Sequence, residues 1–72
     1  MSTSPWRQYW PEYRVKFVDE TARCLADHQN AANGGWKGLT KQQQNNLTDY
    51  TAAVFLAQAR AMDNLVKQGS AL

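Results

Sequence analysis

Cysteine and histidine are almost absent from this chain of 72 residues, each occurring only once. One cysteine excludes an internal disulfide, and Cys24 with His28 falls short of the four ligands that a structural zinc site takes. A chain this short buries only about 60% of its unfolded surface, so small folds usually need a disulfide, a metal or a second copy of themselves. The sequence therefore favours oligomerisation as the source of extra burial.

Long apolar runs and a strong charge of either sign are also missing. The longest apolar run, AAVFLA, has six residues, whereas a membrane helix needs about 20. The start, MSTSPWRQYWPEYR, lacks the apolar core of a secretory signal, and a lone thiol fits a reducing compartment. We therefore expect a soluble, cytoplasmic protein with no membrane contact. Its net charge of +2 is too mild to indicate nucleic acid by itself.

The stretch 47–66, LTDYTAAVFLAQARAMDNLV, has the periodicity of an amphipathic helix. Its apolar side chains cover roughly half of the helix circumference, more than the stripe of about 100° that faces one neighbour. The sequence predicts a helix that is buried on two sides. The central apolar line of this helix comprises Leu47, Val54, Ala61 and Leu65.

Two prolines organise the N-terminal part of the chain. Ser4 before Pro5 has the pattern of a helix cap followed by proline at the first helical position, which predicts a short helical segment over 5–10. Pro11 repeats this start signal within a helical pattern. Its missing N–H and its ring should break or kink the helix near Trp10.

The residues from 11 to 32 again have a helical pattern, with one charged and one apolar face. On the charged face, Glu12 with Lys16 and Asp19 with Arg23 are spaced for i,i+4 ion pairs. A second apolar line runs through Tyr13, Phe17 and Cys24 beside the first. The first apolar line comprises Val15, Val18, Ala22, Leu25 and Gln29.

The sequence Asn33-Gly34-Gly35 ends that helix, because asparagine and glycine adopt the left-handed conformation that terminates helices. We expect a loop over 33–39. Thr40 with Gln43 three residues later is a capping-box start for a second helix over 40–68, followed by a tail over 69–72. A connection of this length returns the chain antiparallel. The predicted fold is all-α, an antiparallel helical hairpin forming one domain over 1–72.

Centring the turn on Trp36 makes the numbers of facing residues add up to about 72. Val18 then meets Val54, and the Trp6–Trp10 segment arrives near Met62. The second apolar line of each helix stays uncovered, and two hairpins packed through these lines make a homodimeric four-helix bundle with twofold symmetry. The predicted dimer interface comprises Tyr13, Phe17, Cys24, Phe55, Met62 and Val66.

Tryptophan, tyrosine and arginine, the residue types enriched at binding hot spots, cluster near the N-terminus. For Trp6 and Trp10 a structural role is an equal alternative, in which they cap the open end of the bundle. Leu56 falls among charged residues on the helical wheel, where a single exposed leucine is ordinary but can also anchor another protein. The predicted partner-binding residues are Arg7, Tyr9, Trp10, Arg14 and Leu56.

Cys24 and His28 lie four residues apart on a helix, a spacing that lets an imidazole activate a thiol. Cysteine is more commonly a small core residue, and the sequence shows no evident oxyanion hole or pocket. We therefore expect no enzymatic activity, no metal and no cofactor.

Three function classes remain open. The first is a small regulator or inhibitor that occupies a surface of another protein, and the second is a structural or assembly subunit. The third is an RNA or DNA binder, which is less favoured because acidic residues interrupt the basic ones. Its candidate phosphate contacts are Arg7, Arg14, Lys16, Lys37 and Lys41.

With the segment SPWRQYWPEYR followed by two helices about GGWKGLT, the chain resembles the small helical host-takeover inhibitors encoded by phages, which include the anti-activator of quorum sensing. The resemblance is one of size and architecture. It implies a dimer in the host cytoplasm that binds a host protein, such as a transcription regulator, and blocks it sterically. The RNA-binding hairpin dimers that control plasmid copy number are the other architectural relatives.

Overall fold

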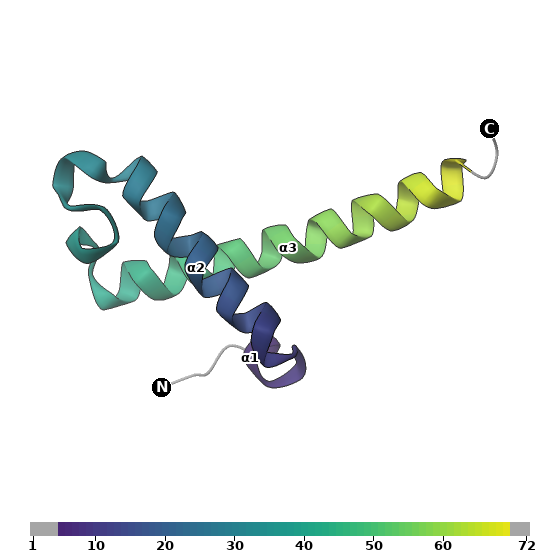
Figure 1. Ribbon diagram of the computed structural model, residues 1–72, viewed down its shortest axis with the longest axis horizontal. Coiled ribbons are helices and arrows are strands. Elements are labelled where there is room, and N and C mark those ends of the chain that lie inside the picture. Colours follow the sequence, from purple (N-terminus) through teal and green to yellow (C-terminus); the bar gives the residue numbers. More distant parts are fainter. Residues whose placement is uncertain (1–4, 70–72) are drawn as a thin grey trace.

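The computed structural model describes residues 5–69, and every element in that range is helical, as the sequence predicts. Two long helices pack together and cross, and a short helix lies at the N-terminal end of the first (Figure 1). Two single turns of 3-10 helix connect the long helices. In chain order the elements are α1 Pro5–Tyr9, α2 Glu12–Gln29, η1 Ala31–Asn33, η2 Gly35–Gly38 and α3 Lys41–Gly69.

The start of α3 is the capping box that the sequence predicts. The Thr40 backbone N–H donates to Gln43 Oε1 at 2.9 Å, and the Gln43 backbone N–H donates to Thr40 Oγ1 at 3.1 Å. These bonds satisfy two N–H groups that the start of a helix otherwise leaves unpaired. The helix runs one residue further at its C-terminal end than the predicted 40–68 and begins one residue later.

Pro11 separates α1 from α2 rather than bending one continuous helix. Its φ of −58° and ψ of 153° are extended, and α2 begins at the next residue. The last turn of α1 closes with the Trp10 N–H donating to Trp6 O at 3.0 Å. The predicted Ser4 cap and the tail residues 70–72 lie outside the described residues.

The turn between the long helices is organised by Asn30. Its carbonyl oxygen accepts the N–H groups of Asn33 at 2.9 Å and Gly35 at 2.8 Å, and its Nδ2 donates to Gly35 O at 3.0 Å. Gly34 and Gly35 are left-handed, with φ of 97° and 62°. The glycines therefore mark the turn as predicted, but α2 ends at Gln29, before the predicted 32, because Asn30 already closes the helix.

The core between α2 and α3 is built from small side chains. Val18 and Ala22, both on the apolar line predicted for α2, are buried. Small residues at a crossing let two helices approach closely, because little side-chain volume separates their backbones. The buried residues of α2 are Val18, Ala22 and Ala26, and those of α3 are Thr48, Thr51 and Ala52.

The buried face of α3 is centred on two threonines, not on Leu47 and Val54 as predicted. Each threonine hydroxyl donates to the carbonyl four residues earlier at 2.8 Å, Thr48 to Gln44 O and Thr51 to Leu47 O. A buried hydroxyl that is hydrogen-bonded within its own helix avoids the desolvation penalty of an unpaired one. Leu47 and Val54 are half-buried beside these threonines.

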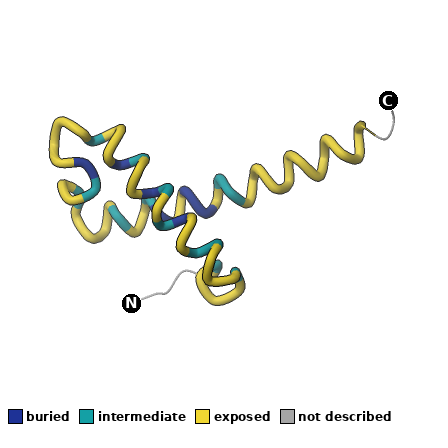
Figure 2. Tube along the Cα trace, viewed as in Figure 1, coloured by how far each residue is buried: buried dark blue, intermediate teal, exposed yellow. Residues whose placement is uncertain are grey.

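The C-terminal half of α3 is exposed to solvent within the described range. Residues 56–69 are exposed throughout, and this half extends away from the crossing with α2 (Figure 2). The radius of gyration is 15.0 Å, against about 11 Å for a compact chain of this length. The prediction that the Trp6–Trp10 segment packs near Met62 is wrong, because Trp6 contacts Asp49 instead.

The predicted rule that the numbers of facing residues add up to about 72 holds for one pair, which lies on the second apolar line of each helix. Phe17 and Phe55, whose numbers add up to the predicted sum, meet edge to face with ring centroids 5.2 Å apart.

Within residues 5–69, no helix combines the length and apolarity needed to cross a bilayer.

Candidate protein-interaction surface

Four side chains between Trp6 in α1 and Arg14 in α2 stack on one another. The Arg7 guanidinium lies 4.6 Å from the Trp6 ring centre, the Trp6 and Trp10 centroids are 5.5 Å apart, and the Arg14 guanidinium lies 4.0 Å from the Trp10 ring centre. Guanidinium groups at these distances are attracted to the electron-rich ring faces. We refer to Arg7, Trp6, Trp10 and Arg14 as the tryptophan–arginine ladder.

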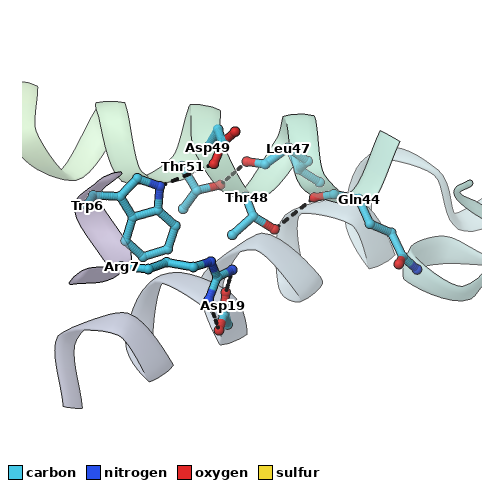
Figure 3. A network of polar contacts seen from close by, with 8 residues as sticks. All are labelled: Trp6, Arg7, Asp19, Gln44, Leu47, Thr48, Asp49 and Thr51. Atoms are coloured by element: carbon cyan, nitrogen blue, oxygen red, sulfur yellow. Dashed lines mark hydrogen bonds and ion pairs between the residues drawn. The ribbon is translucent and has the colours of Figure 1, made fainter. Parts of the chain in front are cut away.

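Polar contacts attach the ladder to both long helices (Figure 3). The Trp6 indole N–H donates to Asp49 Oδ1 on α3 at 3.2 Å. The Arg7 guanidinium forms a two-pronged pair with Asp19 on α2, at 2.7 and 3.2 Å. A helix of five residues is not stable on its own. These contacts, together with the ring stack, therefore hold α1 in place.

The pairing of Asp19 with Arg7 corrects the ion pairs predicted along α2. Asp19 was expected to pair with Arg23, but Arg23 lies 3.8 Å from Glu20 instead. The predicted pair of Glu12 and Lys16 is present at 3.7 Å. Asp19 faces α1, where a bidentate arginine offers a better-matched partner than a side chain one turn along the same helix.

The ladder itself is partly covered, whereas the tyrosines beside it are not. Trp6, Trp10 and Arg14 are half-buried, so the tryptophans are neither fully enclosed nor free. Tyr9 is 81% exposed and Tyr13 is 76% exposed. Of the predicted partner-binding residues near the N-terminus, Trp10 and Arg14 thus form the fixed part of the surface, and Tyr9 projects most.

The residues predicted for a dimer interface lie on one face of α2 and one face of α3, which contact each other at Phe17 and Phe55. Phe17 and Phe55 partly cover each other within one chain, so they are not wholly unpartnered as expected. Cys24, Tyr13, Met62 and Val66 are exposed. An open groove of about 480 Å³ runs between α2 and α3 at this point, lined by Tyr13, Arg14, Phe17, Thr21, Phe55 and Gln58.

Leu56 and Trp36 have different environments. Leu56 is exposed on α3 beside the crossing, where the helical wheel placed it. Trp36 is half-buried over the turn. Its backbone N–H donates to Asp27 Oδ1 at 2.9 Å, and its backbone carbonyl accepts from Gln44 Nε2 at 3.0 Å. Trp36 therefore secures the turn, and Leu56 belongs to the outer surface.

Cys24 and His28 both lie on the exposed surface of α2. Within the single chain Cys24 is not part of the core, since the buried face of α2 passes through Val18, Ala22 and Ala26, and its place in a dimer interface stays a prediction. Among residues 5–69, no three side chains of histidine, cysteine, aspartate or glutamate gather closely enough to hold a metal ion.

Sequence reasoning identified the arginines and tryptophans of the ladder but missed the two carboxylates that anchor it. Asp49 lies 43 positions from Trp6, and Asp19 lies 12 positions from Arg7. Each pair joins residues of two different helices, so no local sequence signal links these residues. No protein-family model, curated protein or solved structure matches this chain.

Proposed function

We propose that this chain is a non-enzymatic protein-binding regulator that acts by covering a surface of another protein. The observation that carries the proposal is the tryptophan–arginine ladder, attached to both long helices, with the exposed Tyr9 and Tyr13 beside it. Tryptophan, tyrosine and arginine dominate binding hot spots because they offer large rigid areas with a polar end.

The fixed geometry of the ladder favours tight binding. Immobilising a flexible side chain on association costs about 0.5–1.5 kcal/mol. The Arg7 guanidinium is already held by Asp19, and the Arg14 guanidinium is already stacked on Trp10. A partner therefore meets side chains that have little remaining freedom to lose.

The residues of this surface divide into contacts and supports. Tyr9 and Arg14 are the expected contact residues, with Tyr13 at the edge. Arg7 is a positioning residue, since its guanidinium is engaged by Asp19. Arg14 has no carboxylate within ion-pair distance among residues 5–69, so the partner surface is expected to offer an acidic side chain next to an apolar patch.

The class of target rests on the resemblance to phage-encoded inhibitors. That likeness makes a host transcription regulator the expected partner, and steric obstruction the expected mode of action. The identity of the target stays a prediction that the capture experiment below addresses.

Nucleic-acid binding has less support from the described residues. Of the five cations assigned to phosphate contacts, Arg7 is paired with Asp19 and Lys16 with Glu12. Phosphate contacts make binding strongly dependent on salt. Partner binding that weakens only slightly with added salt therefore favours a protein target over RNA or DNA.

Affinity capture from a host lysate, read by mass spectrometry, tests the proposed function. A chain with Tyr9→Ala and Arg14→Ala should lose the partner that the wild type recovers, with affinity reduced about 30-fold for truncations of about 2 kcal/mol. Tyr50→Ala is the matched control, because Tyr50 is also a largely exposed tyrosine but belongs to α3 and is not one of the ladder residues. Equal recovery of every partner by the double variant and the control contradicts the proposal.

A further inference from the structure

A continuous apolar seam runs along α3, with residues alternately four and three positions apart. This is the heptad spacing through which helices pair side by side. The crossing with α2 buries the first part of the seam, and the last part is open, with Met62 64% and Val66 63% exposed. The seam comprises Thr48, Ala52, Phe55, Ala59, Met62 and Val66.

The open part of the seam lies beyond the crossing of α2 and α3, where the two long helices diverge (Figure 1). The segment before Pro11 does not cover it, because Trp6 in α1 bonds to Asp49, in the first third of α3. Residues 56–66, about 15 Å of helix, are all exposed in the part of the chain that the structure describes.

We propose that a second copy of this chain covers the open seam, with the two α3 helices antiparallel about a twofold axis. The accessible surface of the chain is 5704 Å², whereas a compact protein of 8.2 kDa exposes about 4,500 Å². The excess of about 1,200 Å² exceeds the roughly 800 Å² that each partner buries in a standard interface. The chain therefore exposes enough additional surface to form a standard interface with a second copy.

The side-chain sizes along the seam select one register. With Ala59 facing the partner's Met62 and Phe55 facing the partner's Val66, a small residue meets a large one and an aromatic ring meets a branched chain. The partner's Val66 then enters the groove lined by Phe17, Phe55 and Gln58. Shifting by one heptad either brings the partner against Ala52, which α2 already buries, or shortens the overlap. Both copies make the same contacts, as a twofold interface requires.

Sedimentation equilibrium measures the dimer directly. The wild type should dimerise at micromolar concentration, and Met62→Glu or Val66→Glu should raise the dissociation constant about 100-fold, because each change buries two unpaired carboxylates per dimer. Asn64→Glu adds the same charge on the opposite side of the same helix and should leave the constant unchanged. Since Met62 and Val66 are already exposed in the single chain, circular dichroism should show that both variants stay helical.

Disulfide trapping tests the register. In a Cys24→Ser background, a mixture of Ala59→Cys and Met62→Cys chains should cross-link faster than Asn64→Cys chains mixed with either, because only facing positions come within disulfide distance. Equal cross-linking in all mixtures contradicts the antiparallel register.

A wild-type chain that is folded and monomeric throughout the micromolar range overturns the inference. A dimer that survives both glutamate substitutions overturns it as well, because the contact must then lie elsewhere. These outcomes are separate from the proposed function. The capture experiment measures binding of another protein at Tyr9 and Arg14, whereas sedimentation measures the chain by itself with its ladder intact, so either proposal can fail alone.

Discussion

Removing the two carboxylates that hold α1 should detach this helix while leaving the long helices packed. The change is Asp19→Ala together with Asp49→Ala, which takes away the partners of Arg7 and of the Trp6 indole N–H. The matched control is Asp63→Ala, because Asp63 also pairs with a cation, Lys67, at 3.2 Å but lies on α3 away from α1.

The size of the effect follows from the two contacts. The side chains of Arg7 and Asp19 are 35% and 33% exposed, so their two-pronged pair contributes about 1 kcal/mol after solvent screening. The bond from Trp6 to the Asp49 carboxylate also lies near the surface and contributes about 1 kcal/mol. Together they stabilise the docked state of α1 by about 2 kcal/mol, which is a factor of about 30 in its equilibrium.

Hydrogen exchange at the Trp10 amide reports this equilibrium. That N–H donates to Trp6 O at 3.0 Å, in the last turn of α1, so it exchanges when α1 opens. The double variant should exchange about 30-fold faster there, whereas amides of α2 near Val18 should keep their protection. Unchanged protection at Trp10, or an equal acceleration by Asp63→Ala, refutes the reasoning that these carboxylates hold α1.

Two further predictions concern the turn and the start of α3. Gly38→Ala should lower the melting temperature more than Gly34→Ala, because a Cβ at Gly38 would overlap the backbone carbonyl of Asn33. A Cβ at Gly34 meets other atoms only at 3.4 Å, so its main cost is the positive φ, about 1–2 kcal/mol. An equal loss in both variants contradicts this ranking. Thr40→Ala should lower the free energy of unfolding by about 1 kcal/mol, since the bond to the Gln43 N–H is lost. An unchanged denaturant midpoint speaks against that contribution.

Local signals in the sequence were sufficient to predict the three α-helices, but not the two 3-10 turns at 31–33 and 35–38, where a helix end and a loop were predicted. Thr40 and Gln43 satisfy each other within one turn of helix, so their spacing alone identifies the start of α3. Pro11 lacks an N–H and restricts its own φ, so the interruption near Trp10 is also a local property. Gly34 and Gly35 mark the turn for the same reason, because both adopt positive φ.

The packing depends on contacts that have no local signal. The position of α1 depends on Trp6 reaching Asp49 and Arg7 reaching Asp19, and both pairs join residues of different helices. The centre of the α3 face was misplaced because threonine is counted as polar in a periodic pattern. Thr51 becomes compatible with burial only when its hydroxyl bonds to the carbonyl of its own helix.

The tryptophan–arginine ladder likewise combines one contact that the sequence indicates with others that it does not. Trp10 and Arg14 are four positions apart and stack across the start of α2, so their clustering was visible in the sequence. Their attachment to the body of the molecule was not, since it is made by Arg7 and Trp6 across the chain.

The extended backbone at Pro11 sets the direction in which the N-terminal residues travel. With an ordinary helix-forming residue there, 5–29 could form a single straight rod that leads away from α3, because the two long helices cross (Figure 1). Trp6 would then not reach Asp49, and Arg7 would not fold back onto Asp19. A single imino acid thus determines whether the first residues of the chain rest on both long helices or project into solvent.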